Sequence, residues 1–186
     1  EINNEAINLT SAELYQVTVD NRAGAHETAV ITTRLSKTKL ERYVNKIVTF
    51  WYGPSARRNR FYGYVTVIAP NRNYQKDTVV DITCLGVTWP MQTGSPRWFT
   101  NKSATEAAVE VMSSYPIGFI GDTSSYQWPT LAQTGDSDWE FLNELADRVG
   151  YSVYSYNGVV RFVNPVNIIN STTPVRALVK GDDVYD

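Results

Sequence analysis

The segment SDWEFLNELADRV, residues 137–149, holds four carboxylates, of which three are candidates for chemistry: Asp138, Glu140 and Glu144. Paired carboxylates do the acid–base work of glycoside hydrolases, which need them ~5–9.5 Å apart across a cleft. Nothing in the sequence brings a second acidic segment to this one. Ordinary helix physics accounts for all three: Glu140 stands in capping-box spacing from Ser137, Asp138 suits the N-terminal end of the helix dipole, and Glu144 falls on a solvent face. We predict a structural role for them.

A nucleophile–base pair is formally available in Cys84 and His26, the only cysteine and the only histidine. Cys84 stands in mid-strand beside Ile82, however, where a small buried hydrophobe is the expected identity. The sequence contains no nucleophile elbow, phosphate loop, paired zinc-binding histidines or calcium loop. A single cysteine also excludes an intrachain disulfide and a cysteine-based zinc cage. We therefore predict that the chain is not an enzyme and uses no metal or cofactor.

Two features suggest binding. Arg57, Arg58 and Arg60 form a basic cluster in a predicted hairpin loop, which suits phosphate contact, a solvated loop or a contact to a partner. The formal net charge of -2 argues against a general nucleic-acid binder, so we predict a partner-contact loop. Five tryptophans include candidates for stacking on sugars, but Trp89-Pro90 and Trp128-Pro129 are more typical of rigid corners or interface anchors.

The first half of the chain predicts strands. YQVTVD, TAVITTRL, KIVTFWYG, NRFYGYVTVIAP and DTVVDITCLG are rich in β-branched and aromatic residues, at the spacing of a barrel or sandwich. Within 61–68, alternation predicts two faces, with Gly63 at a bulge or close approach. One face holds Tyr62, Tyr64, Thr66 and Ile68, and the other holds Phe61, Val65 and Val67.

The second half predicts two helices and a hairpin. Ser103 and Glu106 form a capping box ahead of one helix, and residues 137–149 form the other, ended by a left-handed Gly150. Residues 118–135 read as a loop. Asn157-Gly158 predicts a type I′ hairpin turn within 151–163. The predicted fold class is therefore β-rich α+β: a β-barrel domain at 1–98, then a small α/β insert domain of two helices and a β-hairpin at 99–186.

Bulk properties limit the function further. The 186 residues include 12 Lys and Arg against 8 Asp and Glu in residues 1–100, and 5 against 11 in residues 101–186, giving halves of +4 and -6. This asymmetry indicates two modules or stacking against oppositely charged neighbours. No apolar run reaches the ~18–20 residues of a membrane span, and no signal peptide is present, so we expect no membrane insertion by this piece.

The order of these parts resembles the phage tail hub, or baseplate hub, family, which includes late control protein D and the N-terminal region of VgrG spike proteins. The resemblance is carried by the Tyr-Gly-Pro turn, the return strand FYGYVTVI, VDITCLGVTWPM, the helix ATEAAVEVM and the segment SDWEFLNELADRVGYSVYSYNGVVRFVNP. It covers about residues 45–165 and is strongest at 137–165. In that family a Trp/Phe-rich helix that ends in Gly precedes a Tyr-rich hairpin.

The resemblance implies a structural virion protein. Hub proteins form a threefold ring that closes the tail tube at its cell-facing end, and each full-length member contributes two similar barrels around an α/β insert. This chain has one barrel and the insert, and 186 falls near the start of a linker to a possible second barrel. The implied partners are other copies in a homotrimer, the tail tube and distal tail proteins, a tail-tip or spike protein, and DNA as passing cargo. The implied location is the tail tip.

The aromatic strands supply more tyrosine and tryptophan than one small barrel interior is expected to use. We therefore predict that Trp51, Tyr52, Tyr62 and Tyr64 contribute to an oligomer interface. A receptor- or carbohydrate-binding tail module is the alternative function, and a cell-wall hydrolase domain is the third. A sugar binder should lose glycan binding when one exposed tryptophan is changed, whereas a hub subunit should lose ring assembly.

Overall fold

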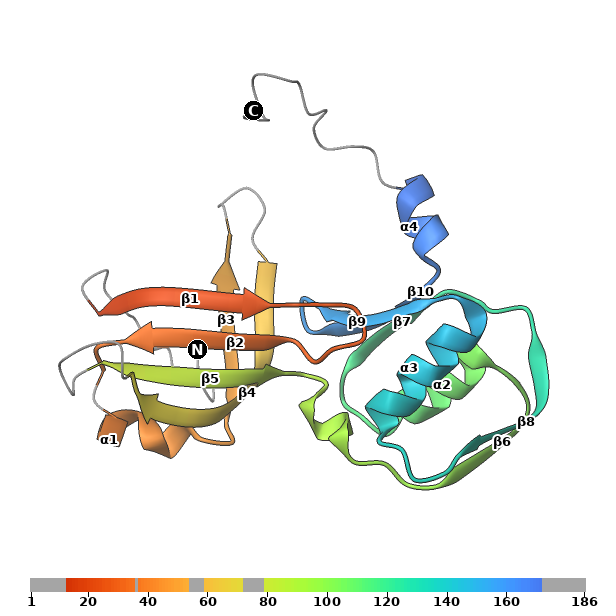
Figure 1. Cartoon of the computed structure of the whole chain (residues 1–186), viewed down its shortest axis with the longest axis horizontal. Coiled ribbons are helices and arrows are strands. Elements are labelled where there is room, and N and C mark those ends of the chain that lie inside the picture. Colours follow the sequence, from red (N-terminus) through yellow and green to blue (C-terminus); the bar gives the residue numbers. More distant parts are fainter. Residues whose placement is uncertain (1–12, 36, 54–58, 72–78, 172–186) are drawn as a thin grey trace, which may run out of the picture.

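The computed structural model describes residues 13–35, 37–53, 59–71 and 79–171. They form two modules that lie side by side (Figure 1), each with its own hydrophobic cluster. We call residues 13–86 the sheet module and residues 87–171 the α/β module. The division lies between Cys84, in the first cluster, and Val87, in the second.

The sheet module is one curled antiparallel sheet in the order β1-β2-β5-β4-β3, a half-barrel in outline (Figure 1). Its strands are β1 (Leu14–Asp20), β2 (Thr28–Thr33), β3 (Ile47–Tyr52), β4 (Asn59–Pro70) and β5 (Val80–Gly86). The short helix α1 (Lys37–Leu40) and the 3-10 turn η1 (Glu41–Tyr43) connect β2 to β3 and place Leu40 and Tyr43 in the core. Within the described part of the chain, β1 and β3 each pair with a single strand, so both edges are open.

Alternation along β4 holds only in its first half. Phe61 and Val65 share one face, as predicted, and both are buried in the module's cluster. The pairing with β5 then shifts between Val65 and Val67, and the bulged Thr66 donates its hydroxyl to the carbonyl oxygen of Thr83 at 3.1 Å. The bulge reverses the faces beyond it: Ile68 is buried and Val67 is 51% exposed, opposite to the prediction.

The α/β module is a small mixed unit. Its elements are η2 (Trp89–Gln92), β6 (Arg97–Ser103), α2 (Ala104–Met112), β7 (Gly118–Gly121), β8 (Gln127–Gln133), α3 (Asp138–Val149), β9 (Ser152–Tyr156), β10 (Val159–Val163) and α4 (Pro165–Ser171). The sheets are β7-β10-β9 and β6-β8. Residues 118–135 were predicted to be a loop, but they form β7 and β8. Strand β7 is short and pairs only with a distant segment, and β8 contains Pro129, which is unfavourable inside a strand. For these reasons the local sequence pattern did not indicate strands here.

The predicted starts of both helices and the predicted end of α3 are confirmed. Ser103 and Glu106 form a capping box at α2, as do Ser137 and Glu140 at α3. Gly150 ends α3 in the left-handed conformation, with φ of 68°. The predicted hairpin is β9-β10, and its turn residues Asn157 and Gly158 have φ of 54° and 80°.

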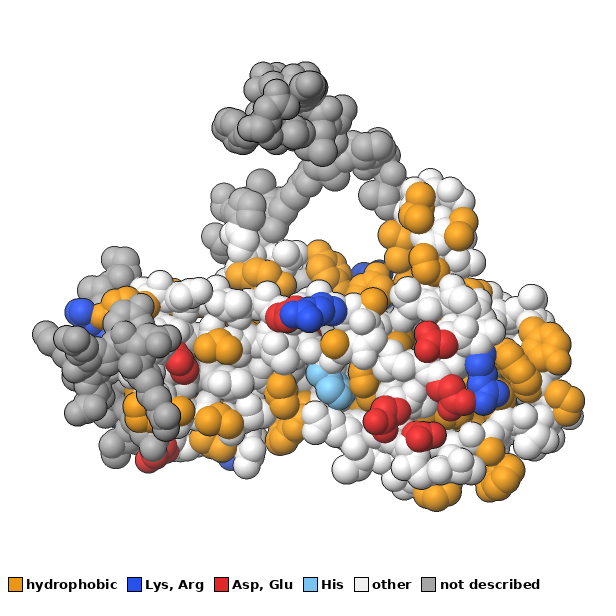
Figure 2. All heavy atoms as spheres, in the orientation of Figure 1, with side chains coloured by type: hydrophobic (Ala, Val, Ile, Leu, Met, Phe, Trp, Pro, Cys, Tyr) orange, Lys and Arg blue, Asp and Glu red, His pale blue; other side chains and the backbone are white. Residues whose placement is uncertain are grey.

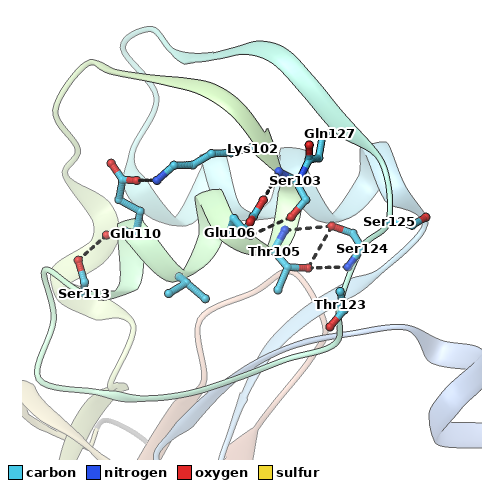
Figure 3. A pocket seen from close by; sticks show the side chains of 11 residues that line it. Lys102, Ser103, Thr105, Glu106, Glu110, Ser113, Thr123, Ser124, Ser125 and Gln127 are labelled. Carbon is cyan, nitrogen blue, oxygen red and sulfur yellow. Dashed lines mark hydrogen bonds and ion pairs between the residues drawn. The ribbon is translucent and has the colours of Figure 1, made fainter.

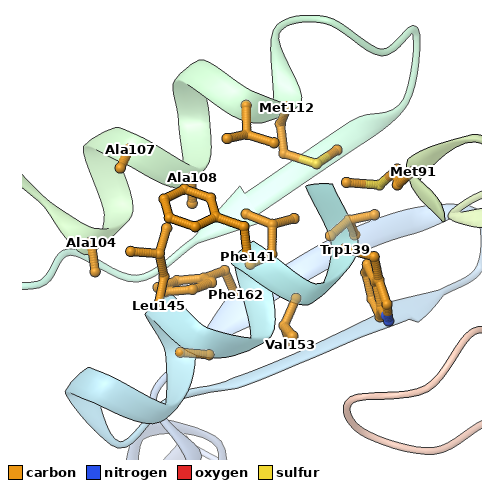
Figure 4. Close-up of a cluster of buried hydrophobic side chains, with 14 of the residues drawn as sticks. Met91, Ala104, Ala107, Ala108, Met112, Trp139, Phe141, Leu145, Val153 and Phe162 are labelled. Carbon is orange, nitrogen blue, oxygen red and sulfur yellow. The ribbon is translucent and has the colours of Figure 1, made fainter. Parts of the chain in front are cut away.

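The core of the α/β module forms where α2 and α3 cover the inner face of β9 and β10 (Figure 4). Phe99 and Phe141 stack with ring centroids 5.5 Å apart. Ala104, Ala107 and Ala108 give α2 a smooth face against Phe141 and Leu145 of α3 (Figure 4). The predicted fold class is confirmed: a β-rich, curled sheet module is followed by a small α/β module.

Candidate interaction surfaces

Asp138 is a buried structural anchor. It is 1% exposed, and its carboxylate accepts from Arg97 Nη2 at 2.9 Å, Tyr115 OH at 2.7 Å and Gln133 Nε2 at 2.7 Å. The prediction of a structural role therefore holds, but helix-dipole stabilisation is not the main reason. Asp138 holds together β6, the loop after α2, β8 and the start of α3. Burial and the hydrogen bond to Asp138 raise the pKa of the Tyr115 hydroxyl.

The other two carboxylates are engaged on the surface of α3. Glu140 Oε2 accepts from the Ser137 backbone N–H at 2.9 Å, and this bond holds the pKa of Glu140 below its ordinary value. Glu144 forms an ion pair with Arg148 one turn later, at 2.5 Å. The three carboxylates thus serve helix capping, surface pairing and core anchoring.

His26 and Cys84 lie in different surroundings. His26 Nδ1 lies 2.8 Å from Thr88 Oγ1, and its ring stacks on Trp139 with centroids 5.2 Å apart. Burial lowers the pKa of His26. Cys84 is fully buried in the sheet module's core, where burial raises the pKa of its thiol to about 12. A thiol this hard to ionise is unsuited to nucleophilic attack.

Among the residues that the structure describes, no group of three or more His, Cys, Asp or Glu is placed to hold a metal ion. No described helix is long and apolar enough to cross a membrane. A groove of about 640 Å³ runs along α2 (Figure 3), but its polar groups bond to one another: Lys102 with Glu110, Ser103 with Glu106, and Thr105 with Ser124.

The two modules meet along the β1–β2 loop. Asn21 Nδ2 donates to the carbonyl oxygen of Ser155 at 2.7 Å, and the Gly24 N–H donates to that of Val153 at 2.8 Å. Trp139 Nε1 donates back to the carbonyl oxygen of Gly24 at 3.2 Å. These bonds fix the loop to β9 and α3, so the junction is specific.

Glu27 is buried in this junction at 1% exposure. Ser155 Oγ lies 3.4 Å from its Oε2, and Oε1 has no hydrogen-bond partner among the described residues. Burial raises the pKa of Glu27 to about 7, and the Ser155 hydrogen bond offsets this only in part. Burial raises the pKa of Tyr52 on β3, and the charge of Glu27 adds to this.

We expect Glu27 to make the stability of the protein pH-dependent. The pKa of Glu27 is about 7 in the folded protein and ordinarily 4.5, so the folded protein holds this proton more tightly than the unfolded chain does. Protonation of Glu27 therefore stabilises the folded state. The contribution of Glu27 to stability should be complete below pH 4.5 and should fall by roughly 3 kcal/mol as the pH rises to 7. Urea unfolding of Glu27→Gln, which cannot ionise, should lack this fall. An unchanged slope between those pH values in the variant would contradict the prediction.

The residues predicted for an oligomer interface differ in their surroundings. Trp51 is 60% exposed, whereas Tyr52, Tyr62 and Tyr64 are half-buried. Tyr62 packs against the core of the α/β module, and Tyr64 contacts Trp89 with ring centroids 5.5 Å apart. Two of the aromatic side chains on β4, Tyr62 and Tyr64, therefore contact the α/β module.

Arg60 is also tied to the α/β module. Its backbone N–H donates to Asn157 Oδ1 at 2.7 Å, and its guanidinium lies over the rings of Trp51 and Tyr62 at 5.9 and 5.2 Å from their centroids. Arg57 and Arg58 lie outside the described residues.

Sequence reasoning missed Tyr156 and Arg161, which continue this surface. Tyr156 OH donates to Asn59 Oδ1 at 2.8 Å, and the Arg161 guanidinium lies 5.7 Å from the Tyr156 ring centroid. The hairpin turn sets a register that pairs Val159 with Tyr156 and Arg161 with Tyr154. Because side chains alternate along each strand, Tyr156 and Arg161 lie on the same face of the hairpin, and the sequence pattern could have indicated this.

Further apolar side chains are exposed away from the junction. They include Trp98 at 70% and Tyr126 at 60% in the α/β module. Helix α4 exposes Val166 and Ile169, and Figure 2 shows the apolar side chains of this helix standing out from the surface. Scattered exposure of this kind is common, but large aromatic rings are typical of binding surfaces.

No family model and no curated protein matches this sequence. Solved structures do match. The E. coli c3393 protein, described as a component of the type VI secretion system with structural similarity to the T4 bacteriophage tail proteins gp27 and gp5, is 13% identical. The match covers 81% of this chain and 47% of that one, with a TM-score of 0.59.

Two tail proteins match in the same way. The tail protein from Neisseria meningitidis MC58 is 9% identical over 80% of this chain and 50% of its own, with a TM-score of 0.52. The 43 kDa tail protein of prophage MuSo2 from Shewanella oneidensis is 15% identical over 79% and 51%, with a TM-score of 0.50. At these identities the likeness shows a shared fold. The chain spans about half the length of these proteins.

Proposed function

We propose that this chain is a structural subunit of a phage tail and, more specifically, a hub subunit in a ring at the end of the tail tube. The observation that carries the proposal is the arrangement of a curled sheet module followed by an α/β module. About four-fifths of the chain matches two proteins named as tail proteins and a type VI secretion component described as similar to T4 tail proteins. The contacts at the junction support it, because they hold the two modules together as one building block.

The surfaces support assembly. The sheet module has two open edges, β1 and β3, within the described residues, and open edges pair readily with other chains. Leu14, Tyr15 and Val17 on β1 and Ile47 and Trp51 on β3 are exposed. Closing a ring would cover edges of this kind. We propose a ring of three copies, which joins the tail tube to tip proteins while DNA passes through.

The proposal also excludes hydrolysis by this chain. Asp138, Glu140 and Glu144 of the α3 segment each have a structural partner, and the one cysteine is buried in the core. Any cell-wall hydrolysis would therefore have to be carried out by another protein.

Immunogold labelling and reconstruction of intact particles test the location. Antibodies raised against the purified chain should label the cell-facing end of the tail tube, and the reconstruction there should hold three copies around the axis. Labelling along the whole tube would indicate a tube role, and labelling of peripheral fibres a receptor-binding role. Either result, or particles that lack the chain, rejects the hub proposal.

A receptor- or carbohydrate-binding module is the second candidate, favoured by the exposure of Trp98 and Tyr126. Changing Trp98 to alanine should abolish glycan binding if this function is correct, and should leave ring assembly intact. A hub subunit should show the reverse dependence, with assembly lost through changes at the sheet edges.

A further inference from the structure

The outer face of the sheet β7-β10-β9 carries aromatic side chains and an arginine. Its inner face sends Val153, Val160 and Phe162 into the core, so the alternate residues Tyr154, Tyr156 and Arg161 point away from α3. Tyr154 stands directly across from Arg161 in the register. None of these three side chains is fully buried.

Arg60 and Trp51 extend this surface across the junction. The hydrogen bond between Tyr156 and Asn59 brings the end of the hairpin against the start of β4. A Cβ atom built on Gly158 would lie 3.1 Å from Arg60 Nη2, so the guanidinium rests on the hairpin turn. Arg60, Arg161, Trp51, Tyr154 and Tyr156 together form what we call the cationic face.

Neither arginine of the cationic face is neutralised within the described part of the chain. No described carboxylate lies within ion-pair distance of either one, and Nε of both Arg60 and Arg161 is buried without a hydrogen-bond partner there. Arg22, Arg97 and Arg148, in contrast, each pair with a carboxylate. Arginines that lie against aromatic rings and have no carboxylate partner of their own suit a partner chain that supplies carboxylate oxygens.

The opposite side of the α/β module is acidic. Phe141 and Leu145 of α3 face the sheet across the core, so Glu140, Glu144 and Asp147 face away from it. Arg148, paired with Glu144, is the one basic side chain on this turn of the helix. Figure 2 shows a group of acidic side chains with one basic neighbour on this module. We call Glu140, Glu144 and Asp147 the acidic face.

We propose that the cationic face of one copy binds the acidic face of α3 in a second copy. Opposite charges on opposite sides of one module favour head-to-tail contact, which closes into a ring when the rotation between copies allows it. Aromatic and arginine side chains are also enriched where interfaces are strongest. The inference rests on the proposed ring subunit and names one of its contacts.

Site-directed cross-linking of the full chain tests this contact. One copy carries Val159→Cys beside the cationic face, and the other carries Asp136→Cys just before α3; a short bismaleimide joins cysteines that come close. The native Cys84 is fully buried and gives little background. Mixed dimers are expected, with a yield that falls as salt is added. Arg22→Cys in place of Val159→Cys, on an exposed loop of the sheet module, should give none.

Charge reversal makes the test specific. Arg161→Glu should lower the yield of mixed dimers about tenfold, as should Arg60→Glu independently, and Asp147→Arg in the other copy should restore it. Circular dichroism confirms that each variant is folded. No dimers in the unaltered pair, equal dimers with Arg22→Cys, or a yield indifferent to both reversals would overturn the proposal. Binding of duplex DNA to this face in place of dimers would overturn it in favour of nucleic acid.

The outcomes separate this contact from the proposed function. A three-copy ring in particles whose subunits give no such cross-link rejects the contact and leaves the hub role standing. Cross-linked dimers from a protein that labels the whole tube or a fibre reject the hub role and leave the contact standing.

Discussion

Replacing Asp138 with alanine should lower the free energy of unfolding by about 3–5 kcal/mol, among the largest effects that a single change in this chain can have. The carboxylate is the shared acceptor for Arg97, Tyr115 and Gln133. Its loss leaves a guanidinium, a hydroxyl and an amide without the group that satisfies them. The Arg97 side chain is only 24% exposed, so water cannot replace the carboxylate fully.

Urea unfolding followed by tryptophan fluorescence measures this effect, and the melting temperature should fall by about 10 °C. Asp136→Asn is the matched control: it changes an exposed carboxylate two residues away and should shift stability by less than about 0.5 kcal/mol. Asp138→Asn keeps the shape and loses the charge, so its cost should be intermediate. Wild-type stability in Asp138→Ala would show that the network is not an anchor.

The variants Asp138→Ala and Asp138→Asn also distinguish a structural anchor from a catalytic acid. A catalytic carboxylate can be changed to an amide with loss of activity and little loss of stability. An anchor should show the opposite, with reduced stability and no hydrolysis of peptidoglycan or glycan in either protein. Cleavage by the unaltered chain that disappears in Asp138→Asn would overturn the structural interpretation.

Local signals in the sequence predicted the features whose causes are local. The capping boxes at Ser103 and Ser137, the left-handed Gly150 and the Asn157-Gly158 turn depend on residues three or four positions apart, and all four are present. Helix α3 and the hairpin β9-β10 follow from them. These elements place Glu140, Glu144 and Asp147 on one side of the module and Arg161 on the other.

Features that depend on distant partners were not predictable in the same way. Arg97 and Asp138 are 41 residues apart, so the sequence offered a helix-end explanation for Asp138 and no sign of the network. The bulge at Thr66 is set by pairing with β5, and β7 exists because β10 lies beside it. The position of Arg60 against the hairpin turn likewise needs the contact between the modules.

Gly63 is a further residue whose replacement should be severe. A Cβ atom there would lie 2.1 Å from the carbonyl oxygen of Leu85 and 2.8 Å from Cα of Gly86 on β5. Both are backbone atoms in the paired strand, so no side-chain rotation relieves the overlap. Gly63→Ala should force β4 and β5 apart and lower the free energy of unfolding by about 3 kcal/mol. Of the two features predicted for Gly63, a bulge or a close approach, the close approach is found at this residue, and the bulge lies three residues later at Thr66.

The consequence extends to the junction, because Gly86 itself lies against Glu27. A Cβ atom on Gly86 would be 2.9 Å from that of Glu27, and the Gly86 N–H donates to the carbonyl oxygen of Glu27 at 2.7 Å. Displacing β5 therefore disturbs the strand that buries Glu27, and the pH dependence of stability should weaken along with stability. Gly118→Ala is the control, since its Cβ would meet only a methyl group of Val159 at 3.2 Å. Equal stabilities of the two variants in urea would contradict the backbone overlap at Gly63. A destabilised Gly63→Ala that keeps the full pH dependence would contradict the expected effect on Glu27 and show that Glu27 remains buried without this strand contact.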